Sequence, residues 1–191
     1  MMICKAKSIT KTKWLSLFDI SYRIDGAKER FWVVATRNET PKCVSRLFEK
    51  PDIVMIVPFH RRQSKVVVTR EFRVALADYE YGFPTGLVEP GETVADAARR
   101  ELREETGFEV TRIMKTSPAV YSSAGITDES SVLMYVECDG EHSDATPHDG
   151  ELIEVVLVSP EEAGLLCADT SLKFDAKSWL VLAQFASTGL I

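Results

Sequence analysis

The chain has 191 residues, of which 45% are hydrophobic, and carries a formal net charge of −6 at pH 7. This length and composition suffice for one packed domain, or for a domain with a small annex, and exclude a fibrous or disordered chain. The acidic balance argues against a general nucleic-acid binder, which would carry a basic stripe, so nucleic acid is not expected as a partner.

The N-terminal residues and the cysteines indicate the compartment. Residues 1–14, MMICKAKSITKTKW, lack an apolar core long enough for a signal peptide, and no segment reaches transmembrane length, so no membrane partner is expected. The cysteines form no CxxC pair and have no histidine at ligand spacing, which argues against zinc. They are Cys4, Cys43, Cys138 and Cys167. Free thiols are expected, and a cytoplasmic location with them.

The first elements in chain order are two strands. Residues 14–24, WLSLFDISYRI, and residues 30–36, RFWVVAT, are rich in aromatic and branched side chains and are joined through Asp25 and Gly26, a hairpin signal. A polar stretch with a proline, RNETPKC, follows. We therefore expect a small N-terminal β-annex over residues 1–50 and a larger domain over residues 51–191.

The larger domain begins with two apolar runs of strand length, residues 52–59 and 65–72, and HRRQS between them predicts a turn. After an acidic helix, strands are expected in VTRIMKTSPAVYSS, SVLMYVEC and LIEVVLVS, with the loop DGEHSDATPHDGE before the last. Pro160 opens a short helix, and residues 175–187 predict an amphipathic C-terminal helix. Strands around two or three helices predict an α/β sandwich.

The acidic helix is predicted over residues 94–106, within GETVADAARRELREETGFE. Thr93 is suited to cap its first turn, with Asp96 as the capping-box partner. Gly107 is a suitable left-handed residue at the C-terminal end.

The glutamates of this helix fall where an apolar face should be. At about 100° per residue, Glu101 and Glu105 lie beside the apolar stripe and Glu104 flanks them. Like charges at these spacings repel one another, and Arg100 can form an ion pair with only one of the glutamates. A hard divalent cation, Mg²⁺ or Mn²⁺, fits the remainder. From this helix alone, a metal site and a solvated glutamate-rich face are equally good interpretations.

A longer stretch of sequence, from Gly86 to Phe108, favours the metal site over the solvated face. Gly86, Glu92 and the run Arg100 to Phe108, RELREETGF, resemble the Nudix box, the signature of the Nudix hydrolase family. The resemblance implies an α/β/α fold in which Arg100 organises the glutamates and cations bridge the oxygens of a diphosphate. The implied metal ligands are Glu101 and Glu105 directly, Glu104 through one ion or a water, and the backbone carbonyl of Thr85.

Stretches outside the box narrow the resemblance. TKWLSL, KERFWVVATR, REFRV, FPTGLVEPGET, SPAVYSSAGITDE and DGELIEV resemble, in kind and order, the ADP-sugar pyrophosphatase branch of this family. The branch implies Mg²⁺-dependent hydrolysis of ADP-ribose or a related ADP-sugar to AMP and a sugar phosphate. It also implies a homodimer in which a tryptophan on an annex strand of each subunit grips adenine. The implied substrate-binding residues are Trp14, Trp32, Arg37, Arg73, Gly86 and Leu87.

Each of these assignments has a plainer alternative. An aromatic residue on a strand is usually core, and an arginine is usually part of a surface ion pair. Glu151, in a loop that resembles the mobile catalytic loop of the family, is the candidate to orient or deprotonate the attacking water, with Glu154 and Asp149 as alternatives. Gly82 stands where the branch often has a glutamate, which leaves the preferred substrate and the number of metal ions open.

Two alternative functions remain open from the sequence. One is hydrolysis of another nucleoside diphosphate derivative, such as GDP-mannose. The other is a Nudix module that binds ADP-ribose without cutting it.

Overall fold

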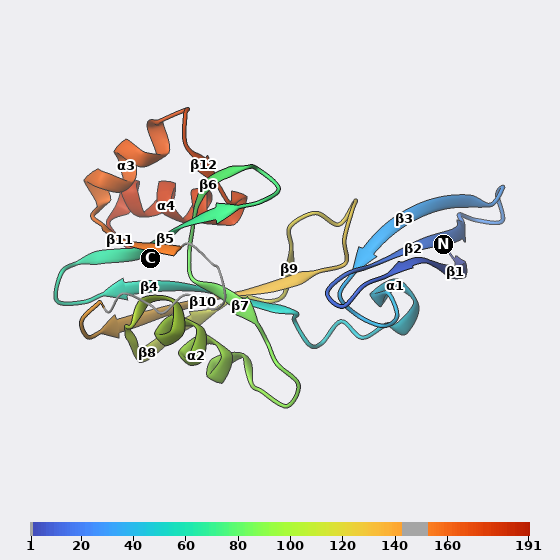
Figure 1. Cartoon of the computed structure of the whole chain (residues 1–191), viewed down its shortest axis with the longest axis horizontal. Coiled ribbons are helices and arrows are strands. Elements are labelled where there is room, and N and C mark those ends of the chain that lie inside the picture. The colour runs from blue at the N-terminus through green and yellow to red at the C-terminus, as the bar shows by residue number, and fades with distance from the viewer. Residues whose placement is uncertain (1, 143–152) are drawn as a thin grey trace. The chain divides into compact units, whose positions relative to one another are not determined.

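The computed structural model describes residues 2–142 and 153–191 (Figure 1). By its internal contacts the chain divides into two compact units. The first comprises Met1–Asp52 and Ala119–Ser131, and the second comprises Ile53–Pro118 and Val132–Ile191.

The first unit is built on an antiparallel sheet in the order β1-β2-β3. The hairpin between β2 and β3 contains Asp25 and Gly26, both with positive φ, as the sequence predicted. β1 was not predicted, because its apolar and polar residues do not show the regular alternation that marks a half-buried strand, and most of them are exposed. The elements of this unit are β1 (Met2–Lys11), β2 (Ser16–Arg23), β3 (Arg30–Thr36), the short helix α1 (Lys42–Ser45) and β9 (Val120–Tyr121).

The second unit contains a mixed sheet whose main path is β12-β6-β5-β4-β10-β8, with β7 paired to β4 and β11 paired to β5. β10 (Ser130–Asp139) begins in the first unit and continues into the second. The other strands are β4 (Ile53–His60), β5 (Lys65–Arg73), β6 (Asp78–Gly82), β7 (Thr85–Leu87), β8 (Glu109–Thr116), β11 (Ile153–Val158) and β12 (Lys173–Phe174). The helices are α2 (Val94–Thr106), α3 (Pro160–Ala168) and α4 (Ala176–Thr188).

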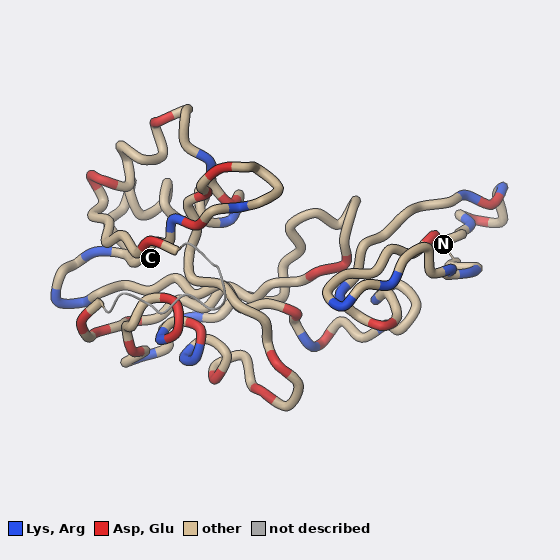
Figure 2. The backbone as a smooth tube through the Cα atoms, in the orientation of Figure 1, with Lys and Arg blue, Asp and Glu red and all other residues tan. Residues whose placement is uncertain are grey.

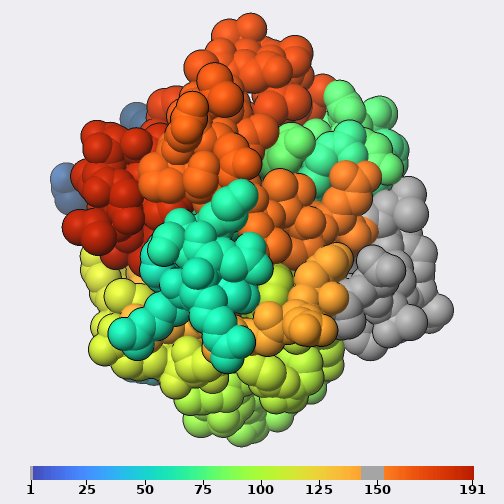
Figure 3. Space-filling model, turned by 90° about the vertical axis from the view of Figure 1, so that its left-hand side faces the viewer, coloured from blue at the N-terminus to red at the C-terminus, as the bar shows by residue number. Residues whose placement is uncertain are grey.

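Alternation along the central strands sends side chains to both faces of this sheet. On β4, Val54 and Ile56 lie in the core shared with α2, whereas Met55 and Val57 lie in the core shared with α3 and α4. All four side chains are buried. Figure 3, an end-on view, shows α3 and α4 in orange and red above and α2 with β8 in yellow-green below. This helix–sheet–helix layering confirms the α/β/α sandwich.

α2 begins and ends where the sequence predicted. The Thr93 hydroxyl accepts a hydrogen bond from the Asp96 N–H at 3.1 Å, and Gly107 ends the helix with φ of 78°. The Asp96 carboxylate accepts from the Thr93 hydroxyl at 2.6 Å instead of from the N-cap backbone, so the capping box is only half formed.

One predicted strand is interrupted. The stretch VTRIMKTSPAVYSS forms two strands, β8 and β9, because Pro118 has no N–H to donate between them. Among the described helices, none is long and apolar enough to cross a bilayer.

Candidate active site

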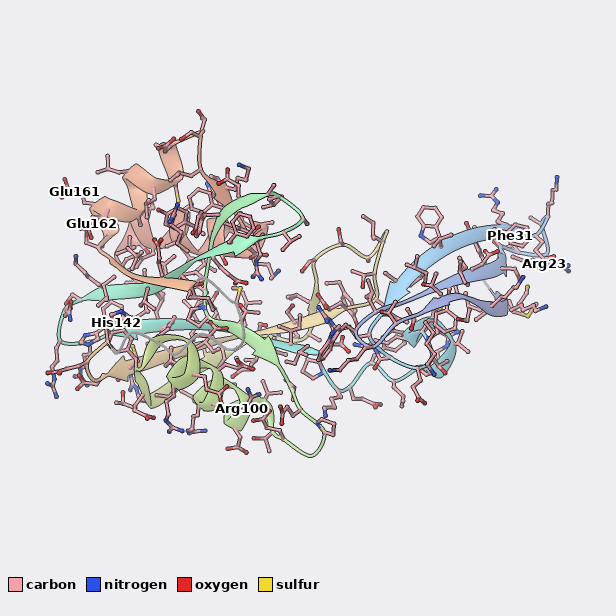
Figure 4. The ribbon with its side chains drawn as sticks, in the orientation of Figure 1. Arg23, Phe31, Arg100, His142, Glu161 and Glu162 are labelled. Carbon is pink, nitrogen blue, oxygen red and sulfur yellow. The ribbon has the colours of Figure 1, made fainter. Side chains whose placement is uncertain are left out.

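Arg100 is the centre of an ionic cluster on α2 (Figure 4). Its Nη1 donates to Glu101 at 2.7 Å and to Glu104 at 3.2 Å, while its Nε and Nη2 each donate to Glu92 at 3.0 Å. Nη2 also donates to the carbonyl of Leu87 at 3.0 Å. Hydrogen bonds to Glu92, and then to Glu101 and Glu104, raise the pKa of Arg100. A permanently charged guanidinium therefore joins the helix to the loop that precedes it.

Glu101 lies directly against Gly86. A Cβ added at Gly86 would stand 1.7 Å from Glu101 Cδ, so a glycine is required there if the carboxylate is to keep this position. The side chain of Glu101 is only 14% exposed. Burial raises the pKa of Glu101 even though Arg100 contacts it, because the loss of hydration outweighs one shared cation.

Glu105 lies against the neighbouring residue of the same strand. The N–H of Thr85 donates to Glu105 at 3.3 Å. Glu101 and Glu105 thus converge on Gly86 and Thr85 of β7, one turn of helix apart. Figure 2 shows acidic and basic residues following one another along this helix.

The chemistry of this cluster fits a hard divalent cation. Its donors are carboxylate oxygens, which are the ligands that Mg²⁺ and Mn²⁺ prefer. Glu101 is also a largely buried carboxylate whose charge Arg100 only partly offsets. Within residues 2–142 and 153–191, however, no three acidic, histidine or cysteine side chains already surround one point. Glu101 and Glu104 accept from Arg100, and Glu105 accepts from the Thr85 N–H, so an ion would compete with these partners for the carboxylate oxygens.

The two candidate adenine ligands lie in the first unit. Trp32 is on β3, is 50% exposed, and donates its indole N–H to the carbonyl of Gly125 at 2.9 Å. Trp14 is 63% exposed, with Lys13 Nζ 4.2 Å from its ring centroid. Trp14 was expected on a strand, which is wrong: hydrogen bonds between Thr12 and Leu15 form a turn around it. Both rings have surface available for stacking.

Both candidate phosphate-binding arginines are held in ion pairs. Arg37, in the first unit, pairs with Glu129. Arg73, in the second, pairs with Glu71 at 2.6 Å and with Glu80 at 3.2 Å. The plainer alternative, a surface ion pair, therefore describes the structure, and contact with substrate stays a prediction for both.

The candidates for the water-activating base are only partly visible. Glu151 and Asp149 lie outside the described residues. Glu154, on β11, accepts hydrogen bonds from Arg70 Nη1 with both carboxylate oxygens, each at 2.8 Å. The Arg70 guanidinium lies 3.8 Å from the ring centroid of Tyr79. Glu154 is therefore an ion-pair partner in this structure, and its role as an alternative to Glu151 stays a prediction.

Gly82 leaves room for a side chain. A Cβ there would meet only Ser178 Oγ and Thr69 Oγ1, both at 3.9 Å, which is ordinary van der Waals contact. Steric crowding therefore does not explain the glycine at this position.

Sequence reasoning missed the contacts of Arg70 and of the Leu87 carbonyl. Arg70 faces Glu154 because β5 and β11 pair in that register, and the pairing joins residues far apart in the sequence. No local pattern signals such a register.

Comparison with known proteins gives one family. Residues 49–181 match the family model described as NUDIX domain. The ADP-sugar pyrophosphatase of Mus musculus is 28% identical over 188 residues, which cover 92% of this chain and 83% of the mouse protein. The ADP-ribose pyrophosphatase of Saccharomyces cerevisiae is 30% identical over 141 residues, covering 72% of this chain and 59% of the yeast protein. A crystal structure of an ADP compounds hydrolase superposes with a TM-score of 0.70 at 20% identity, covering 99% of this chain and 96% of that one, and shows the same fold.

Proposed function

Because the chain belongs to the Nudix hydrolase family, we propose that it hydrolyses the diphosphate of ADP-ribose or a related ADP-sugar, giving AMP and a sugar phosphate. The observation that carries this proposal is the convergence of Glu101 and Glu105 on Gly86 and Thr85. The names of the mouse and yeast relatives support the choice of substrate class.

Mg²⁺, or Mn²⁺ in its place, would supply positive charge to the diphosphate oxygens as water attacks phosphorus. Glu101 and Glu105 would hold the ion, with Glu104 and the carbonyl of Thr85 completing the protein's ligands. Arg100 anchors the cluster through Glu92 and the Leu87 carbonyl, and these contacts do not involve the three glutamates that bind metal.

The remaining roles concern substrate and water. Glu151 would orient or deprotonate the attacking water. Gly86 and Leu87 would lie against the substrate, and Arg37 and Arg73 would exchange their carboxylate partners for phosphate oxygens, which suit the same planar fork. Trp14 of one subunit and Trp32 of the other would stack on the two faces of adenine, each worth about 1–3 kcal/mol.

The proposal includes a homodimer and a cytoplasmic location. A clamp that uses one tryptophan from each subunit needs two copies of the chain. All four cysteines are free thiols, as in proteins of a reducing compartment.

The test is incubation of the purified chain with Mg²⁺ and ADP-ribose, followed by chromatographic identification of nucleotides. AMP and ribose 5-phosphate are expected. GDP-mannose is assayed in parallel, and faster release of GMP would favour the other sugar nucleotide. Tight binding of ADP-ribose without any product would favour a binding module. Failure to release a nucleoside monophosphate from any substrate would contradict the enzyme assignment.

A further inference from the structure

The segment from Ser123 to Ser130 is fastened along β3, although it lies far from β3 in the sequence. The N–H of Ala35 donates to the Ile126 carbonyl at 2.8 Å, and the N–H of Asp128 donates back to the Ala35 carbonyl at 3.4 Å. Ala35 and Thr127 form a parallel bridge. This segment therefore extends the edge of the three-stranded sheet.

Trp32 depends on this segment for one of its contacts. Its indole N–H donates to the carbonyl of Gly125, within the same segment, at 2.9 Å. Trp32 is half exposed, and the bond to Gly125 fixes the direction of its indole N–H. Movement of Gly125 would therefore change the plane that Trp32 offers for stacking.

Lys42 holds the other end of the segment. Its side chain is only 3% exposed, and its Nζ donates to Asp52 at 2.5 Å and to Ser130 Oγ at 2.7 Å. Its backbone N–H donates to Asp128 at 2.6 Å. Asp52 also accepts from the Ser130 N–H at 2.8 Å. A buried lysine is costly unless paired, and such pairs are retained in some proteins because they specify one conformation.

We propose that Lys42 is a positioning residue for nucleotide binding: it fixes the segment from Ser123 to Ser130 against β3, and the Gly125 carbonyl then orients Trp32 toward adenine. This inference rests on the proposed function. Lys42 itself touches no substrate. Its loss raises the KM for ADP-ribose and leaves kcat unchanged, because the metal-binding glutamates belong to the other unit.

Two variants release the segment in different ways. Lys42→Met with Asp52→Asn removes the buried ion pair without leaving a lone charge, and Asp128→Ala removes the acceptor of the Lys42 N–H. The second variant keeps the test decisive if the first does not fold, as judged by circular dichroism. Glu39→Ala, at an exposed residue of the same unit, is the control for loss of a carboxylate.

The first readout is the indole N–H resonance of Trp32 in a ¹⁵N–¹H correlation spectrum, assigned by its disappearance in Trp32→Phe. Both variants should shift it and leave the resonances of Trp14 and Trp179 in place. This measurement requires no activity, so it separates failure of the positioning role from failure of the proposed function. An unmoved Trp32 resonance would overturn the inference.

The second readout is a double-mutant cycle. Each variant should raise the KM for ADP-ribose by about three- to tenfold, the range expected for one lost hydrogen bond. The same change made in Trp32→Phe, which keeps a stacking ring but has no N–H, should add little. Fully additive effects on KM, or a fall in kcat alone, would show that Lys42 does not act through Trp32.

Discussion

At the scale of single residues, Glu101 and Glu105 lie against consecutive residues of β7. The i, i+4 spacing of Glu101 and Glu105 is enough to predict that they share a face of α2. Their contacts with Gly86 and Thr85 could not be predicted from spacing alone, because they depend on how β7 packs beside the helix. These contacts place two carboxylates side by side, as the metal-site interpretation needs, while no three acidic, histidine or cysteine side chains of the described residues surround one point.

Replacing either glutamate by glutamine should remove nearly all turnover. Glu101→Gln and Glu105→Gln keep the shape of the side chain and remove the negative charge that would hold a dication. We expect kcat/KM for ADP-ribose to fall by at least about a hundredfold, or ~2.7 kcal/mol of transition-state stabilisation. The control is Glu109→Gln, at a 52% exposed residue paired with Arg103. Wild-type rates in either active-site variant would rule out these ligands.

Gly86→Ala should abolish activity and leave the fold intact. The added Cβ would meet the end of the Glu101 side chain at 1.7 Å, and that flexible end can move without moving the backbone. Thermal unfolding should therefore change little while kcat/KM falls as it does in Glu101→Gln. Gly164→Ala, where the nearest atom to a Cβ is at 3.9 Å, serves as the matched control. An active Gly86→Ala enzyme would show that the position of Glu101 is not critical.

At the scale of elements, the sequence predicted the helix whose ends are set by its own capping residues, but not the strands that are set by pairing with distant residues. α2 has a capping threonine, a terminal glycine and a helical period, and its limits match the prediction. β1 has no such signal, since its mostly exposed residues are held in place by pairing with β2 rather than by burial. The register of β11 against β5, which pairs Glu154 with Arg70, likewise could not be predicted from a local sequence pattern.

The N-cap of α4 gives a pH-dependent prediction. Asp175 accepts hydrogen bonds from the Ser178 N–H at 2.9 Å and from Lys177 at 2.8 Å. Burial pushes the pKa of Asp175 upward, but these bonds outweigh it and hold the pKa below 3.8. A carboxyl with a lowered folded-state pKa adds stability above its unfolded pKa and loses it as the pH falls through the folded value.

Asp175→Asn keeps the capping oxygen and removes the charge. It should unfold at lower urea concentration than the wild type at neutral pH, by about 1 kcal/mol in unfolding free energy. The difference should vanish well below pH 3.8, where the wild-type carboxyl is also neutral. A difference that persists unchanged in acid would mean that the charge is not what stabilises the cap.

At the scale of the whole molecule, the sequence did not predict which distant segments pack into the same unit. Residues 119–131 make most of their contacts with the first unit, although they follow α2 in the chain. The first unit also leaves large hydrophobic side chains exposed, among them Trp14, Phe31, Trp32, Val33 and Leu47. Exposed apolar residues mark an interaction surface when they lie in one contiguous patch.

The homodimer stays a prediction, and the exposed apolar residues of the first unit offer a way to test it. Sedimentation equilibrium should give twice the chain mass of 21.4 kDa. Phe31→Ser with Val33→Ser, which removes apolar surface that is 64% and 52% exposed, should weaken association at constant secondary structure. A monomer at all concentrations would contradict both the dimer and the adenine clamp shared between subunits.

The α2 glutamates are proposed to hold a dication against a diphosphate. To test this claim, the protein is titrated with Mn²⁺ and the loss of the free-ion signal is followed by electron paramagnetic resonance. The wild type and Glu109→Gln should bind Mn²⁺ equally, whereas Glu101→Gln and Glu105→Gln should bind it at least about tenfold more weakly. Equal Mn²⁺ affinity in all four proteins, or no binding by the wild type, would contradict the claim.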